Sequence, residues 1–186
     1  MKSDNSIRKI SIAAIKRKIR PPYHFSLTTF YETELFKEID RRVAYSLDVG
    51  EGELPVSSVV IDDKNFTIIT TRRIINSDNG RINVIFPNCV RSWHWGDFKE
   101  RIKTPFTIGS LVIDNEQNFE FFIETGEASL VTIYAIRTLI SQHAKTTTQK
   151  AEQLNEKELS LLRDAEKDKK HDRLTSYTNH RDILER

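Results

Sequence analysis

Hydrophobic and polar residues alternate with a period of two through the middle of the chain, from about residue 54 to residue 124. Short β-branched and apolar runs are separated there by turn-forming residues, for example at 62–65 and 77–80. The expected strands cover residues 56–61, 66–71, 72–76, 81–86, 89–95, 106–114 and 118–124. Residues 72–76 are either a strand of their own or a bent continuation of the strand before them. About seven short strands without helices between them predict an antiparallel sandwich or a small barrel.

The period changes to that of a helix on both sides of this region. Apolar residues recur at helical spacing over about 30–47, after a Thr29 and Glu32 pair that fits a capping box. A second amphipathic helix is expected over about 126–143, where Glu127 suits the positive end of the helix dipole. We expect this second helix to pack across the sheet or the mouth of the barrel.

A run of antiparallel strands followed by one terminal helix resembles the pleckstrin-homology (PH)-like superfold. Residues 65–76 and 85–92 are similar to strands of bacterial PH-like domains, and residues 106–112, 118–124 and 127–140 resemble the closing hairpin and helix. The resemblance covers about residues 54–143. It implies an α+β fold, a PH-like antiparallel barrel or sandwich of about seven strands closed by a C-terminal helix. The residue pattern outside this range adds an N-terminal helix and a charged helical tail.

The same resemblance implies a non-enzymatic binding or scaffolding module that acts through protein contacts. Some PH-like domains hold inositol phosphates with basic residues around the first hairpin. Here that hairpin is Asp62-Asp63-Lys64-Asn65, which is net acidic and argues against a phosphoinositide ligand. Peptide recruitment and oligomer formation remain as uses of the superfold.

The composition changes along the chain and suggests four parts. These are a basic arm over 1–22, an N-terminal helical segment over 23–53, the PH-like domain over 54–143, and a charged, partly helical tail over 144–186. Of the 42 residues from 145 to 186, 19 are charged, and the apolar spacing favours an exposed helix over about 148–170. A protein partner, or self-association through this tail, is the expected mode of contact.

The net charge of +2 hides an uneven distribution. Residues 1–20 carry a net charge of +6, whereas residues 21–144 carry −5. The basic side chains of the arm that are candidates for contacts with phosphates are Arg8, Lys9, Lys16, Arg17, Lys18 and Arg20. Alternatively, the arm folds back on the acidic body or is only solvated.

Trp93 and Trp95 form a second candidate surface, because alternate residues of a strand share a face. If that face points inward, both indoles belong to the core. If it points outward, they form, with Arg91 and Lys99, a platform on which bases or a peptide stack. The alternative to a protein-binding module is therefore a nucleic-acid-binding protein that uses the basic arm and this strand.

Arg72 and Arg73 are adjacent in an expected strand, so their side chains should point to opposite faces. One of them is then expected at an edge or in a pair with an acidic residue, and a role in partner binding is the alternative.

Residue types with catalytic or metal-binding spacing do not occur together in the sequence. The six glycines form no phosphate-binding loop, the five histidines form no ligand pair, and Cys89 fits a small buried side chain. We therefore expect no enzymatic activity, no cofactor and no metal. No apolar run approaches the roughly 18–20 residues of a membrane span, and no secretion signal is evident, so a cytoplasmic protein is expected.

Overall fold

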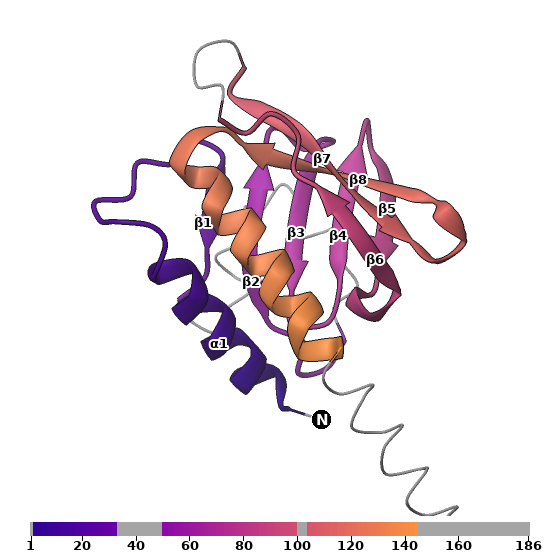
Figure 1. Ribbon diagram of the computed structural model, residues 1–186. Coiled ribbons are helices and arrows are strands. Elements are labelled where there is room, and N and C mark those ends of the chain that lie inside the picture. The colour runs from indigo at the N-terminus through magenta and orange to yellow at the C-terminus, as the bar shows by residue number, and fades with distance from the viewer. Residues whose placement is uncertain (1, 33–49, 100–103, 145–186) are drawn as a thin grey trace, which may run out of the picture. The chain divides into compact units, whose positions relative to one another are not determined.

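The computed structural model describes residues 2–32, 50–99 and 104–144. The chain divides into two compact units, residues 1–144 and 145–186, and all described residues belong to the first. The described part of this unit is an α+β structure with two antiparallel sheets and two helices (Figure 1). The predicted tail helix over 148–170 lies outside the described residues.

The first sheet contains five antiparallel strands in chain order. They are β1 (Thr28–Phe30), β2 (Pro55–Val60), β3 (Phe66–Thr70), β4 (Ile74–Asp78) and β5 (Arg81–Ile85). A two-residue turn joins β4 to β5, and its residues Asn79 and Gly80 both have positive φ, at 51° and 82°. This geometry matches the right-handed twist of the strands, and glycine adopts it without steric cost.

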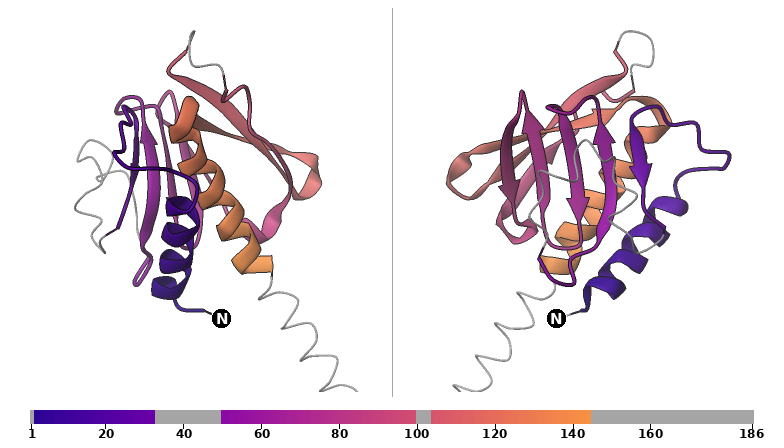
Figure 2. Two further views of the ribbon diagram at one scale, coloured as in Figure 1. Left: turned by 60° about the vertical axis from the view of Figure 1, so that its left-hand side comes forward. Right: turned by 180° about the vertical axis from the view of Figure 1, so that it is seen from behind.

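The second sheet contains three antiparallel strands. They are β6 (Val90–His94), β7 (Phe106–Ile113) and β8 (Asn118–Glu124). No strand pairs across the two sheets in the described part of the chain, and β8 crosses over the inner face of β2, β3 and β4 (Figures 1 and 2). The expected barrel is therefore not closed. The sheets instead face each other as two layers.

Two helices complete the unit and lie side by side (Figures 1 and 2). Helix α1 spans Asp4–Lys16, and residues 129–144 are helical after a 3-10 turn at Gly126–Ala128. Three contacts join them along their length: Lys2 donates to Gln142, the Lys18 ammonium lies over the ring of Tyr134, and the Arg20 amide donates to Glu127. The two helices therefore run in opposite directions.

The main core lies between the sheets and these helices. It is formed by Ile69, Ile74 and Ile85 of the first sheet, by Leu111, Phe119, Phe121 and Ile123 of the second, and by Val131, Ala135, Ile136 and Leu139 of the terminal helix. Ile7 and Ile15 of α1 join the same core. On the opposite face of the first sheet, Tyr31, Phe66, Ile68 and Ile75 form a second buried cluster.

The expected arm thus contributes a helix of the compact unit. In the sequence, Arg8 shares a helical face with Ile12, Ile15 and Ile19, so that face of the helix is not uniformly apolar. Arg8 is nevertheless buried, and its guanidinium donates to the carbonyl of Tyr31 at 2.9 Å. A buried arginine can share an apolar face when its N–H donors find acceptors, and the Tyr31 carbonyl is one such acceptor.

The expected helix over 30–47 starts differently from the prediction. Thr29, the predicted cap, and Phe30 lie in β1, where Thr29 is paired with Ser58 of β2. The hydrophobic pattern does not indicate this eighth strand, so the expectation of about seven strands was one too few for the described residues. The remainder of the predicted helix, residues 33–47, lies outside the described residues.

The carboxylate of Glu124, at the end of β8, binds the backbone of residues 26–28, where the chain enters β1. It accepts the backbone N–H groups of Ser26, Leu27 and Thr28 at 2.8, 3.1 and 2.7 Å, and the side chain is buried. Each hydrogen bond to a charged acceptor contributes about 1.5–3 kcal/mol to the free energy of unfolding. A buried N–H group that loses its acceptor destabilises the fold, because it has given up its bond to water.

We predict that Glu124→Gln lowers the free energy of unfolding by about 1.5–3 kcal/mol, because the glutamine NH₂ group is a donor and would leave at least one of these backbone N–H groups without an acceptor. Denaturant unfolding measures the change. Glu120→Gln is the matched control, because Glu120 lies on the same strand and is exposed. Equal stability of the two variants would contradict the role given to Glu124.

Candidate functional site

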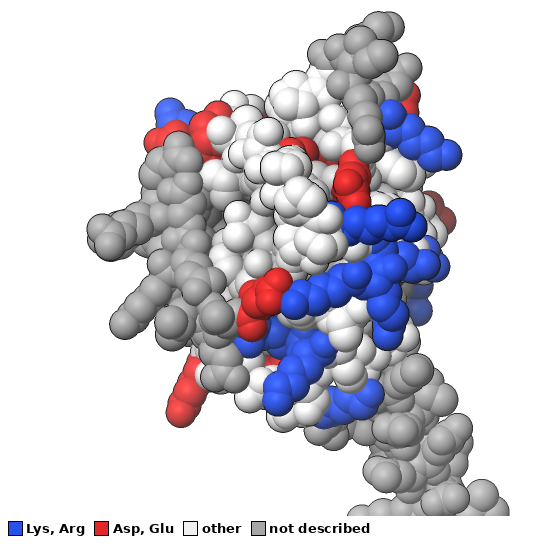
Figure 3. All heavy atoms as spheres, turned by 90° about the vertical axis from the view of Figure 1, so that its left-hand side faces the viewer, with Lys and Arg blue, Asp and Glu red and all other residues white. Residues whose placement is uncertain are grey.

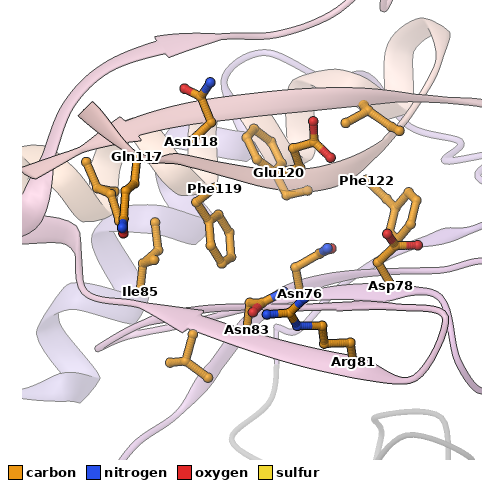
Figure 4. Close-up of a pocket in the computed structure, with 14 residues that line it drawn as sticks. Asn76, Asp78, Arg81, Asn83, Ile85, Gln117, Asn118, Phe119, Glu120 and Phe122 are labelled. Carbon is orange, nitrogen blue, oxygen red and sulfur yellow. The ribbon is translucent and has the colours of Figure 1, made fainter. Parts of the chain in front are cut away.

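A groove of about 450 Å³ opens where β5 and the β7–β8 hairpin diverge. Side chains from the two sheets face each other across it (Figure 4). On the β4–β5 side it is lined by Asn76, Asp78, Arg81, Asn83, Val84 and Ile85; on the other side by Ile108, Ile113 and residues 117–122. The groove is mainly polar on the first side and carries Phe119 and Phe122 on the second.

The hydroxyl of Thr67 connects two residues that line the groove on opposite sides, Asn76 and Phe122. It donates to Asn76 Oδ1 at 2.7 Å across the β3–β4 pair and accepts the backbone N–H of Phe122 at 2.8 Å. All three residues are buried. Because the N–H of Phe122 belongs to β8 at the margin of the second sheet, Thr67 fixes the distance between the two sheets beside the groove.

Strand β5 forms one border of the groove and has an open edge. Within the described residues it pairs with β4 alone. A two-residue hairpin closes on a hydrogen-bonded pair, here Asp78 and Arg81, so alternate residues of β5 direct their backbone groups towards β4. The N–H and C=O groups of Ile82 and Val84 therefore point away from β4, towards the open edge.

Three apolar side chains follow this edge on the outer face of the sheet. Ile82, Val84 and Phe86 are 42%, 41% and 54% exposed, although they are large apolar residues at every second position. Val84 is paired with the buried Ile75, so the exposed row continues the second apolar cluster to the margin of the sheet. Val84 also lines the groove, which places the groove along the edge of β5.

The charges in the groove are Asp78 and Glu120 against Arg81. Their formal sum is one negative charge. An extended segment lying along β5 would therefore meet amide and carboxylate groups on its inner side and apolar side chains on its outer side.

Arg72 and Arg73 have structural partners. They lie in the connection between β3 and β4, so the expectation that both occupy a strand was wrong. Arg72 pairs with Asp4 at 2.8 Å, and Arg73 pairs with the buried Glu53 at 2.9 Å. The first pair ties the start of α1 to the first sheet.

The Trp93 and Trp95 side chains are close together, with ring centroids 6.1 Å apart, but they differ in burial. Trp93 is 42% exposed, whereas Trp95 follows the end of β6, packs on the main core and makes an edge contact with Phe121. Neither predicted orientation therefore describes both residues. Of their expected basic neighbours, Arg91 pairs with Asp114 at 2.6 Å, and the Lys99 ammonium lies 5.9 Å from the ring of Phe98.

The basic residues of the predicted arm differ in burial and in ion pairing. Arg8 is buried, and Lys16 pairs with Glu32 at 2.7 Å. The exposed remainder comprises Lys9, Arg17, Lys18 and Arg20. The structure therefore divides a set that the sequence grouped by charge alone.

The edge of β5 is not among the candidate sites that the sequence predicts. The signal was present in residues 81–86, where Arg81 and Asn83 alternate with Ile82, Val84 and Phe86. Alternation shows that a strand has a polar and an apolar face, but it does not show whether the apolar face is covered.

Comparisons with protein-family models, curated proteins and solved structures give no match to this chain. Among the described residues, no group of three or more His, Cys, Asp or Glu side chains is arranged to hold a metal ion. The helices in that same part of the chain are too short or too polar to cross a membrane.

Asp4 makes the anchoring of α1 dependent on pH. Burial opposes ionisation of its carboxyl group, but hydrogen bonds from Arg72 and Thr71, together with the charge of Arg72, outweigh burial and lower its pKa below the ordinary value of 3.8. A carboxyl group whose pKa is lower in the folded state stabilises the fold above its unfolded pKa.

We predict that the difference in unfolding free energy between the wild type and Asp4→Asn is constant above about pH 5 and shrinks as the pH falls through the folded-state pKa of Asp4. Denaturant unfolding at a series of pH values measures this difference. If it stays the same down to about pH 2, ionisation of Asp4 does not anchor α1.

Proposed function

We propose that this chain is a non-enzymatic, PH-like binding module that acts through protein contacts, and that it docks an extended segment of its partner along β5. The observation that carries the proposal is the open edge of β5 beside a groove, with a row of exposed apolar side chains on its outer face.

The PH-like part of the proposal is supported by the order of the elements. Strands β2–β5 form one antiparallel group, β6–β8 form a second, and a helix follows and packs on both through the main core. The resemblance seen in the sequence has this same order of strands followed by a helix. Because the superfold serves many functions, the docking site itself must be argued from β5.

Strand addition is the binding mode that fits β5. The backbone groups of Ile82 and Val84 would pair with those of the incoming segment, which supplies affinity without requiring a particular sequence. Edge strands that must avoid such pairing commonly carry lysine, proline or a bulge. Residues 81–86 contain no lysine or proline, and the β4–β5 register is unbroken.

Side chains would supply the specificity. Alternate residues of the incoming segment would enter the groove, where Asp78 and Glu120 favour a lysine or arginine. The intervening residues would lie beside Ile82, Val84 and Phe86 and should be apolar. The expected ligand is thus an extended peptide in which basic or polar residues alternate with apolar ones.

Selection from a random peptide library on the full chain tests this function. We expect the enriched peptides to show the basic–apolar alternation, and we expect Val84→Lys to weaken their binding roughly tenfold, about 1.4 kcal/mol, by placing a charge in the apolar row. Fluorescence anisotropy of a labelled selected peptide measures the affinity.

Trp93→Lys is the matched control. Trp93 lies on another edge strand, β6, is as exposed as Val84, and undergoes the same change in charge. We expect this variant to bind the selected peptide like the wild type. The proposal fails if no peptide is enriched, or if Val84→Lys and Trp93→Lys bind it equally well.

Self-association through the tail over 144–186 stays a prediction, because all but the first residue of that range lies outside the described residues.

A further inference from the structure

Basic side chains gather on the face formed by α1, the loop after it and the terminal helix. Figure 3 shows this face from the side of α1, with the blue side chains of lysine and arginine concentrated in one area. Five exposed cations flank α1 or lie on the terminal helix: Lys2 precedes α1, Arg17, Lys18 and Arg20 follow it, and Arg137 lies on the terminal helix. Lys2 and Lys18 contact the terminal helix at Gln142 and Tyr134, and the backbone of Arg20 contacts Glu127 just before it. None of the five forms an ion pair with a carboxylate of the described residues.

These cations are held on a fixed surface. Lys18 and Arg137 come from different elements, yet both approach the ring of Tyr134, at 5.3 and 5.7 Å from its centroid. Lys2 is tied to Gln142 at 2.8 Å by a hydrogen bond that leaves its charge unneutralised. Helix α1, which lies between Lys2 and Arg17 in the chain, is anchored by the pair between Asp4 and Arg72.

We propose that this basic face binds the phosphate backbone of nucleic acid without reading its bases. Five cations at the ends of α1 and on the terminal helix, none of them in an ion pair among the described residues, offer positive charge to the phosphates, and their binding would release condensed counterions. Tyr134 is half-buried and is approached by two cations, so it does not offer a bare ring on which a base could stack.

An anionic membrane surface shares the negative charge but fits the face less well. A helix that lies in a membrane interface inserts its apolar residues, whereas in α1 Ile7 and Ile15 are buried in the protein core and Ile10 and Ile12 are half-buried. Of the large apolar side chains that are more than a third exposed in the described residues, only Tyr23 lies in the segment that follows α1. Two acidic residues, Asp4 and Glu127, border the face, and Asp4 is neutralised by Arg72.

The test is a salt titration of binding between the full chain and a short fluorescent DNA duplex. Five phosphate contacts predict a slope of about −4.5 for the logarithm of the binding constant against the logarithm of salt concentration. We expect a duplex of unrelated sequence to bind with about the same affinity, since phosphates carry no sequence information.

The variant Lys18→Gln/Arg137→Gln should make that slope less negative by about two, one for each lost phosphate contact. The control Lys64→Gln/Arg91→Gln removes the same charge from two exposed positions outside the basic face and should leave the slope unchanged. Unfolding curves of both variants, which should match that of the wild type, show that the fold is retained.

Three results would overturn the proposal. One is the absence of salt-dependent DNA binding. Another is an equal effect of the two double variants, which would indicate net charge instead of a site. The third is binding to vesicles that contain phosphatidylserine, together with no binding to DNA, which would make the face a membrane surface. None of these results bears on peptide binding at β5, because Lys18 and Arg137 do not line the groove.

Discussion

The hydroxyl of Thr67 joins the two sheets through Asn76 and Phe122, two residues that line the groove. It uses its proton for Asn76 and a lone pair for the N–H of Phe122, so that one buried side chain satisfies groups on both β4 and β8. Without it, the N–H of Phe122 would be buried at the margin of the second sheet without this acceptor, which costs about 1–3 kcal/mol. The contact therefore holds β8 over the first sheet, and the groove opens beside it.

The rest of the architecture explains why the groove lies at β5. Helix α1 and the helix over 129–144 cover the core elsewhere, with Ile15 and Ile136 completely buried. The sheets diverge towards β5, where neither helix contributes a lining residue to the groove. The two proposed surfaces consequently lie on different elements: an edge strand with apolar side chains for an extended peptide, and the ends of α1 with the terminal helix, which carry the cations for phosphates.

The sequence predicted the local elements better than their partners. The Asn79-Gly80 turn, the strands around it and the terminal helix follow from turn chemistry and periodicity, because nearby residues determine them. The pairing of Arg72 with Asp4 joins residues far apart in the chain, and no local pattern indicates it. Likewise, Trp93 and Trp95 alternate in the sequence, but β6 ends between them at His94, so one is exposed and the other packs on the core.

Residue-resolved amide hydrogen exchange of the full chain tests the open edge of β5 most directly. The account predicts fast exchange at Ile82 and Val84 and slow exchange at Arg81, Asn83 and Ile85, because alternate N–H groups of β5 face β4. A bound extended peptide should then slow exchange at Ile82 and Val84. Slow exchange at these two amides in the free protein, or no change when a peptide binds, would contradict an open edge that accepts a strand.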